Sequence, residues 1–179
     1  MLLLDVSTGQ ITKLAKILAV SVSWSSDGKR LVLGIPGGDV DPEIEIFDID
    51  SRMMQELVKG EYPSWSPSGD WIAYVDRSKE KVHLVHPDGT DDHVVKDVGG
   101  RVFGYRYFGL LPAWSPDSTK LLLNEYKGDG DAQDVVLLDI KKGEMTTKSH
   151  NGDPVLGWAQ STSKASADSN ATRSRSTGF

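Results

Sequence analysis

Apolar residues gather in short runs along the chain, and polar turns separate the runs. The segment 31–35 is a continuous apolar run, and the segment 45–49 mixes apolar and acidic residues and leads into a turn that contains Asp and Ser. Runs of this length bounded by Gly, Pro, Asp and Ser are typical of β-strands. No segment shows the 3.6-residue apolar period of an amphipathic helix. The pattern predicts an all-β chain with almost no helix.

A repeated motif shows that these strands recur as similar units along the chain. A Trp followed by a polar turn and an apolar strand occurs at 24–33, 65–74 and 114–123, and a stub remains at 157–159. The tryptophans of the motif are Trp24, Trp65, Trp114 and Trp158, and the steps between them are 41, 49 and 44 residues. Steps of this size are typical of β-propeller blades. We therefore expect the four indoles to be structural residues that pack between blades.

Each repeat is predicted to form four antiparallel strands, here named A to D, with the Trp at the end of strand A. The A–B turn contains Gly28 or Gly69 at a position where a tight hairpin favours positive φ. Ser118 stands at this position in the third repeat. The third turn is therefore expected to be strained or of another type.

The repeats divide the chain into complete and partial units. A partial unit is predicted at 1–15, complete units at 18–58, 61–96 and 104–149, and a further partial unit at 154–160. The prediction is a β-propeller of four-stranded antiparallel blades, partial or open, with three full blades. A sandwich or barrel could also be built from short strands, but the regular repeat favours radial blades.

The two partial units do not complete one blade together. The first would supply strands C and D and the last would supply strand A, so that strand B is missing. We therefore expect either a piece of a larger propeller or an unusually small and imperfect one. Residues 161–179 are rich in Ser and Thr and hold no apolar run, and this composition predicts a disordered tail.

The segment Trp114-Ser115-Pro116-Asp117, followed by an apolar strand, resembles the TolB-type, WD40-like repeat, often called PD40. The resemblance covers about residues 1–160, and the Gly-His and Trp-Asp pairs of true WD40 repeats are absent. It implies a β-propeller. In TolB the propeller is a periplasmic protein-docking module, and similar blades occur in tricorn-like proteases, in prolyl-oligopeptidase relatives and in oligogalacturonide lyases. The resemblance thus implies the β-propeller fold. It also suggests a periplasmic or other extracytoplasmic location for a longer protein that would contain this chain.

Loops of variable length are predicted on one rim of the propeller, called here the top face, where the B–C and D–A connections lie. The third D–A connection is longer than the others and contains aromatic residues with interleaved arginines. Its candidate partner-binding residues are Arg101, Phe103, Tyr105, Arg106 and Tyr107. Such side chains supply large contact area and directional charge. The alternative is that this segment lengthens strand A and packs between blades.

Candidate metal and catalytic groups are few. Asp129, Asp131 and Asp134 alternate on a Gly-containing loop and are weak candidates for Ca²⁺, but the distal Glu of an EF-hand loop is missing. The alternative, a solvated polar loop, is preferred. His86 and His93 could meet across a C–D hairpin, whereas His83 falls on the opposite face of its strand from His86. No serine elbow, P-loop or dinucleotide motif is present, so no catalytic residue, metal or cofactor is predicted.

Composition narrows the function classes. The chain has 179 residues, 38% of them hydrophobic and 26% charged, and a net charge of −6. The acidic balance argues against non-specific nucleic-acid binding. No apolar run approaches the roughly 20 residues of a membrane span, and the start lacks the basic region of a signal peptide. The absence of cysteine excludes disulfides and Cys-based zinc sites, and the compartment remains unassigned.

The sequence favours a non-catalytic propeller scaffold that binds another protein through top-face loops. The alternative is the propeller portion of a larger enzyme, either a gating domain of a prolyl-oligopeptidase-like hydrolase or a lyase-like propeller. Neither interpretation assigns a small-molecule ligand. Residues beyond both ends of the printed chain would distinguish these classes, because a hydrolase needs a serine-elbow domain.

Overall fold

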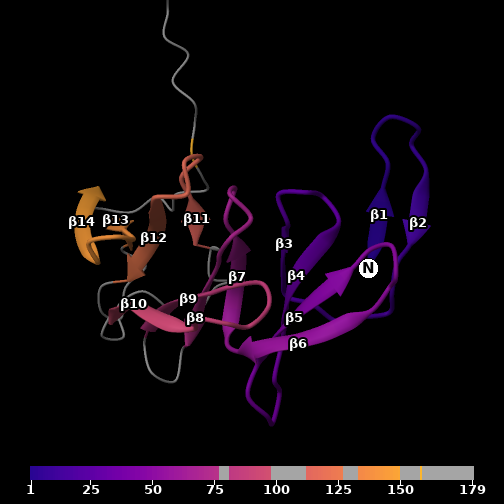
Figure 1. Cartoon of the computed structure of the whole chain (residues 1–179), viewed down its shortest axis with the longest axis horizontal. Helices are drawn as coiled ribbons and strands as arrows, with labels where there is room; N and C mark the ends of the chain where they lie inside the picture. Colours follow the sequence, from indigo (N-terminus) through magenta and orange to yellow (C-terminus); the bar gives the residue numbers. More distant parts are fainter. Residues whose placement is uncertain (77–80, 98–111, 127–132, 150–157, 159–179) are drawn as a thin grey trace, which may run out of the picture.

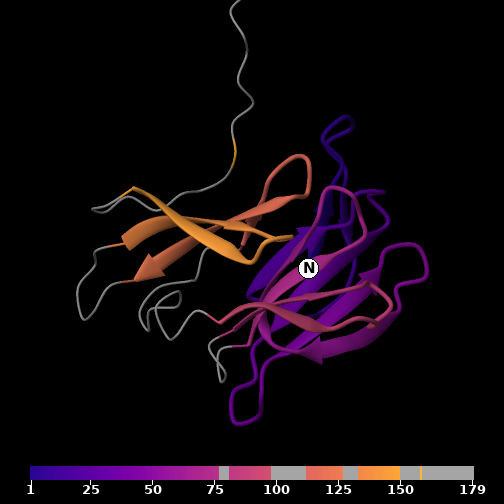
Figure 2. The same cartoon turned by 60° about the vertical axis from the view of Figure 1, so that its left-hand side comes forward.

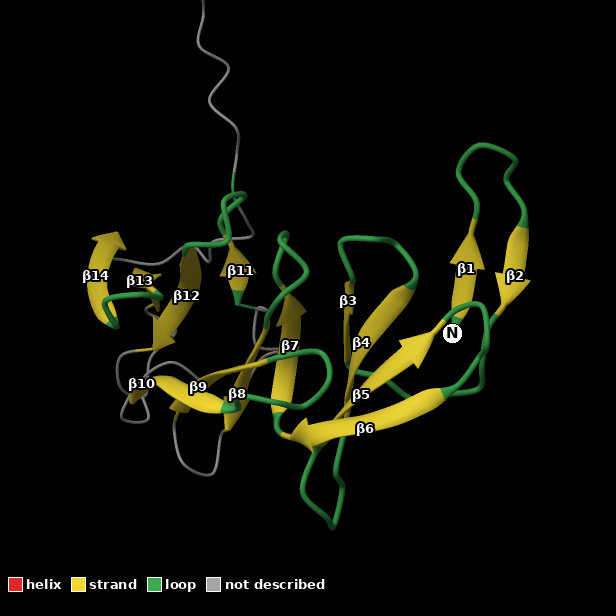
Figure 3. Ribbon diagram, in the orientation of Figure 1, coloured by secondary structure: helices red, strands yellow, loops and turns green. Residues whose placement is uncertain are grey.

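The computed structural model describes residues 1–76, 81–97, 112–126, 133–149 and 158. In these segments every regular element is a β-strand, and none is a helix (Figure 3). The strands form one two-stranded sheet and three four-stranded sheets, each with its strands in chain order. The expectation of an all-β chain built from four-stranded antiparallel units is confirmed.

The sheets follow one another along the chain. The N-terminal hairpin consists of β1 (Leu2–Leu4) and β2 (Ile11–Lys13). Blade 1 consists of β3 (Ser21–Trp24), β4 (Arg30–Ile35), β5 (Glu43–Asp48) and β6 (Met54–Lys59). Blade 2 consists of β7 (Glu61–Trp65), β8 (Ile72–Asp76), β9 (Lys81–Val85) and β10 (His93–Asp97). Blade 3 consists of β11 (Ala113–Trp114), β12 (Lys120–Tyr126), β13 (Gln133–Asp139) and β14 (Glu144–Ser149).

The sheets stand side by side in an open fan (Figures 1 and 2). The N-terminal hairpin lies at one end of the fan and blade 3 at the other. The motif Trp occupies one register position in every blade, since Trp24 pairs with Leu31, Trp65 with Ile72 and Trp114 with Leu121. The fold is a partial, open β-propeller.

The core is divided into clusters that lie between neighbouring sheets. Leu31 and Leu33 of β4 face the N-terminal hairpin, whereas Val32 faces blade 2. The cluster between blades 1 and 2 consists of Val32, Ile44, Ile46, Trp65, Ile72, Tyr74 and Val85. The cluster between blades 2 and 3 consists of Ala73, Val82, Leu84, Trp114, Leu121, Leu123 and Leu138. Because both faces of a blade are buried, its inner strands are continuous apolar runs rather than alternating ones.

Two of the motif tryptophans, Trp65 and Trp114, pack toward the preceding sheet. Trp65 and Trp114 are only 5% and 7% exposed, whereas Trp24 and Trp158 are 47% and 38% exposed. The indole N–H of Trp114 donates to the Ser64 carbonyl of blade 2 at 2.9 Å. Trp65 differs, because its indole N–H donates to a carbonyl of its own turn at 3.1 Å.

The serine after each motif Trp closes the A–B turn. Its hydroxyl oxygen accepts a hydrogen bond from the backbone N–H five residues later. The pairs are Ser25 with Arg30, Ser66 with Trp71 and Ser115 with Lys120, at 2.9, 3.0 and 3.0 Å. All three serines are buried. A buried hydroxyl that satisfies a backbone donor in every blade explains why Trp-Ser recurs as a pair.

The third turn keeps the geometry of the others although it lacks glycine. The N–H of Ser118 donates to the Ser115 carbonyl at 2.8 Å, as Gly28 and Gly69 do to Ser25 and Ser66. Ser118 therefore adopts a positive φ of 57°, which is strained for a residue with a side chain. Its hydroxyl accepts the N–H of Ser68 in blade 2 at 2.9 Å. The turn type is unchanged, and the expected strain is present.

Replacing the turn serine tests this closure. Ser25→Ala removes the acceptor for the Arg30 N–H and leaves a partly buried donor unsatisfied. We expect the free energy of unfolding to fall by about 1–2 kcal/mol in denaturant titrations. Ser26→Ala, at the exposed neighbouring position, is the matched control and should change stability by less than about 0.5 kcal/mol. Equal effects of the two substitutions would show that the buried hydroxyl does not close the turn.

Acid should weaken the third turn. The Ser115 hydroxyl, followed by the Thr119 hydroxyl and amide, lowers the pKa of Asp117 from 3.8 to about 2. A pKa depressed in the folded state contributes stability above the unfolded value, and this contribution is lost as the pH falls toward 2. We expect the melting temperature of wild type to exceed that of Asp117→Asn near pH 5 and the gap to narrow as the pH approaches 2. A gap independent of pH would contradict this expectation.

Candidate functional site

An apolar groove of about 350 Å³ opens on the top face beside blade 1. Its wall comes from the B–C loop of blade 1, from the segment before β3, and from Gly60 and the start of β7. The side chains that shape it are Val20, Ile35, Pro36, Val40, Pro42 and Tyr62. The groove therefore lies where blade 1 meets blade 2, on the rim that carries the variable connections.

Close backbone contacts fix the shape of this groove. A Cβ atom on Gly37 would lie 1.9 Å from the Val40 carbonyl oxygen, so the loop closes only with glycine there. The Val40 N–H donates to the Gly37 carbonyl at 2.9 Å. The Gly60 N–H donates to the Pro42 carbonyl at 2.9 Å and ties the loop to the next blade. The groove is thus formed by backbone held in place rather than by a loose loop.

The groove combines an apolar surface with an acidic rim. Val40 is 69% exposed and Val20 is half-exposed. Asp39 and Asp41 flank Val40 and point their charge at solvent, since both residues are exposed. Apolar side chains on a fixed loop can be covered by a ligand at small entropic cost. The negative rim favours a ligand with positive charge beside its apolar part.

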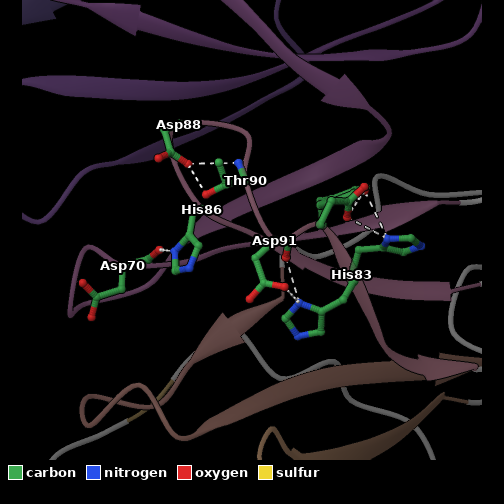
Figure 4. A network of polar contacts seen from close by, with 9 residues as sticks. Asp70, His83, His86, Asp88, Thr90 and Asp91 are labelled. Atoms are coloured by element: carbon green, nitrogen blue, oxygen red, sulfur yellow. Dashed lines mark hydrogen bonds and ion pairs between the residues drawn. The ribbon is translucent and has the colours of Figure 1, made fainter.

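A second site, which is polar, lies within blade 2 (Figure 4). His83 of β9 is the cross-strand neighbour of Tyr74 on β8. The Tyr74 hydroxyl donates to Asp92 at 2.8 Å, and His83 Nδ1 contacts the same carboxylate oxygen at 3.0 Å. Burial and then the Asp92 carboxylate raise the pKa of Tyr74 well above its ordinary range. The phenol therefore stays neutral and acts as a hydrogen-bond donor.

The other two described histidines gather on Trp71. The His86 ring stacks on the indole at a centroid distance of 3.8 Å, and the His93 ring meets it edge-on at 5.4 Å. Nδ1 of His86 bonds the Asp70 carbonyl at 2.8 Å (Figure 4). Nδ1 of His93 bonds the Asp91 carbonyl at 2.8 Å. Both rings are thus oriented by backbone oxygens. Within the described ranges, no three His, Asp or Glu residues form a group that could hold a metal ion.

Solved structures of other proteins share this architecture. No family model matches the sequence, and no curated protein matches it. A solved structure of a TolB-type protein from Agrobacterium tumefaciens is 25% identical with a TM-score of 0.62, over 79% of this chain and 53% of that chain. TolB from Acinetobacter baumannii is 19% identical with a TM-score of 0.60, over 82% of this chain and 36% of that chain. The chain has a TolB-like propeller fold.

A similar fold also occurs in proteins with other activities. An oligogalacturonate lyase in complex with manganese is 20% identical with a TM-score of 0.58, over 82% of this chain and 46% of that chain. At this identity the likeness concerns the fold alone. The chain spans about half the length of the Agrobacterium TolB and a smaller share of the other two proteins.

The sequence candidates fall mostly outside the described part of the TolB-type repeats. The aromatic and arginine residues of the third D–A connection belong to the segment 98–111, which the structure does not describe. Asp129 and Asp131 also lie outside the described residues. Asp134 is described, and it is a buried residue of strand β13 rather than a loop residue. The described residues contain no helix that is long and apolar enough to cross a membrane.

Sequence reasoning missed the groove residues Val40 and Tyr62 as well as the role of Trp71. Val40 lies in the first B–C loop, an irregular connection between β4 and β5. Its Pro-Gly-Gly segment at 36–38 was the available signal, because glycine pairs mark close backbone approach. Trp71 lies inside the motif segment 65–74 but is not one of the recurring tryptophans, and nothing in the sequence pattern links it to His86 and His93. Those contacts depend on strand register and side-chain direction.

The contact between Gly60 and Tyr74 can be tested by adding one methyl group. A Cβ atom on Gly60 would lie 2.5 Å from the Tyr74 ring and 3.0 Å from the Val75 carbonyl oxygen. We expect Gly60→Ala to lower the free energy of unfolding by about 1–3 kcal/mol in denaturant titrations. Gly89→Ala, where the nearest side-chain atom is 3.9 Å away, is the control. If Gly60→Ala lowers the free energy of unfolding no more than Gly89→Ala does, the close contact of Gly60 with the Tyr74 ring is contradicted.

Proposed function

We propose that this chain is a non-catalytic propeller scaffold that binds another protein, with the apolar groove of blade 1 as a docking site for an extended segment of that protein. The observation that supports this most directly is the exposed Val40 on a loop fixed by the Gly37 and Gly60 contacts. Binding sites are typically concave, largely apolar and preformed. The likeness to TolB structures and the protein-docking role implied by the TolB resemblance agree with this proposal.

The proposed ligand segment has a defined chemistry. An apolar side chain of the ligand covers Val20 and Val40, and a Lys or Arg beside it faces Asp39 and Asp41. The net charge of −6 attracts a basic segment at long range and speeds encounter. Glu43 contributes less to this rim, because it forms an ion pair with Lys59.

The third D–A connection supplies a second contact in this proposal. The segment 98–111 joins β10 to β11 as the segment around Gly60 joins β6 to β7. Arg101, Phe103, Tyr105, Arg106 and Tyr107 therefore remain the proposed aromatic and charged contacts for the same partner. The alternative, a propeller portion of a larger enzyme, is supported by likeness of fold alone. No described residue favours it over the scaffold.

Selection from a random peptide library displayed on phage tests the groove without a known partner. We expect enriched peptides to combine an aromatic or aliphatic residue with a neighbouring Lys or Arg. Val40→Asp should weaken binding of a synthetic enriched peptide by about tenfold or more, which corresponds to about 1.4 kcal/mol. Calorimetric titration of the purified chain measures this loss.

Val6→Asp is the matched control, because Val6 is an exposed valine in the turn of the N-terminal hairpin, away from the groove. It should leave the peptide affinity unchanged. Circular dichroism of both variants verifies that the sheets persist. Failure to enrich any peptide, or equal loss in the two variants, would refute the groove as the docking site.

A further inference from the structure

A polar pocket of about 660 Å³ opens between blades 1 and 2 on the face that carries the A–B and C–D turns. Blade 1 contributes Arg30, at the start of β4, and Gln55 of β6. Blade 2 contributes its A–B turn at 69–70 and its C–D turn at 86–90. The volume is typical of small-molecule sites. Because this face lies at the other ends of the strands from the top face, the pocket is separate from the groove of blade 1.

The guanidinium of Arg30 is the one permanent cation among the described residues that line this pocket. Its Cζ atom lies 4.9 Å from the ring centroid of Trp65, which is buried in the cluster between blades 1 and 2. No described carboxylate lies within ion-pair distance of Arg30. The N–H donors of the guanidinium are therefore available to a ligand.

The same position in blade 3 carries a cation with a different partner. Lys120 corresponds to Arg30, because the N–H of each bonds the hydroxyl of the motif serine five residues earlier. Nζ of Lys120 lies 3.9 Å from a carboxylate oxygen of its cross-strand neighbour, Asp139. Arg30 has Asp48 as its cross-strand neighbour and instead reaches over Trp65 of blade 2. The cation of blade 1 is thus directed to the junction with the next blade.

The wall from blade 2 carries negative charge. Asp70 and Asp88 are exposed, and Figure 4 shows them on either side of the His86 ring. One Asp88 carboxylate oxygen accepts the Thr90 hydroxyl at 2.6 Å and the Thr90 amide at 2.9 Å. These two bonds hold the pKa of Asp88 below its ordinary value. The carboxylate of Asp88 is therefore ionised at neutral pH.

Contacts between the two blades hold the walls of this pocket in place. A Cβ atom on Gly69 would lie 2.5 Å from the Ser26 hydroxyl oxygen, so the A–B turns of blades 1 and 2 touch. The indole N–H of Trp65 donates to the Gly69 carbonyl at 3.1 Å. A Cβ atom on Gly89 would lie 3.9 Å from a methyl group of Leu57 on β6. A pocket with fixed walls loses little entropy when it binds a ligand.

We propose that this pocket binds a small zwitterion of the amino acid or short-peptide class, with the ligand carboxylate on Arg30 and the ligand ammonium beside Asp70 and Asp88. A planar guanidinium binds a carboxylate through two parallel N–H···O bonds. A simple anion is attracted by Arg30 but repelled by the two carboxylates, and a simple cation meets the reverse. A ligand with both charges is attracted by both walls. The Gln55 amide donates and accepts hydrogen bonds, which suits a peptide group between the charges.

NMR titration of the isotope-labelled full chain tests the proposal. Glycine, glycylglycine and triglycine place the two charges at increasing separations, and we expect at least one of them to shift the amide signals of Gly69, Asp70 and Thr90 to saturation. The N-acetylated form of that ligand lacks the ammonium and its C-terminal amide lacks the carboxylate. Each should bind weaker by about tenfold or more. No saturable shift with any of the three overturns the site, and equal binding of either capped form overturns the zwitterion assignment.

Arg30→Gln should raise the dissociation constant of this ligand by about tenfold or more, because the carboxylate loses its charged partner. Lys29→Gln is the matched control, since Lys29 is exposed beside Arg30 and does not line the pocket. Asp70→Asn should weaken binding as well, and Asp50→Asn, at an exposed position in a turn of blade 1, is its control. Both controls should leave the dissociation constant unchanged.

Circular dichroism verifies that the sheets persist in each variant. If Arg30→Gln does not fold, Arg30→Lys replaces it. This variant keeps the charge but loses the planar fork, and it should raise the dissociation constant by about threefold or more. Binding that is insensitive to the Arg30 substitution overturns the carboxylate contact, and binding insensitive to Asp70→Asn overturns the ammonium contact at Asp70. The proposed peptide groove lies on the other face, so either proposal can fail without the other.

Discussion

The structure depends on the packing of each sheet against the sheet before it. A four-stranded blade is apolar on both faces, so it cannot bury its side chains alone. The motif Trp makes this contact directional: Trp114 packs on blade 2 and donates to its backbone. Burial of a large indole together with a satisfied N–H stabilises one register of blade on blade. The order of the blades in space thus follows from their order in sequence.

The candidate groove is a consequence of this packing. Tyr74 lies against Gly60, where the chain passes from blade 1 to blade 2, and the Gly60 N–H ties the passing chain to Pro42. The connection is therefore held close to the first B–C loop. Val40 projects from that loop without a cover. A rigid junction with an exposed apolar residue is suited to binding.

The sequence predicted the fold well because the signals for it are local. Trp-Ser pairs at blade spacing identified strand A. The hydrogen bond that closes the turn joins Ser66 or Ser115 to a backbone N–H only five residues later in the sequence. The site was predicted poorly because its contacts are not local. Val40 belongs to an irregular loop, and the stacking of His86 on Trp71 joins the residue after β9 to the residue before β8. The exposure of Trp24 likewise depends on which strands the preceding sheet contains.

Hydroxyl-radical footprinting of the dilute chain, read out by mass spectrometry, tests the central claim most directly. Blade-on-blade packing through the motif indole predicts strong protection of Trp65 and Trp114 together with rapid oxidation of Trp24. Both classes carry the same side chain at the same register position, so only the preceding sheet differs between them. Equal oxidation of Trp24, Trp65 and Trp114 would show that the indoles do not pack on the preceding blade, and it would contradict the account.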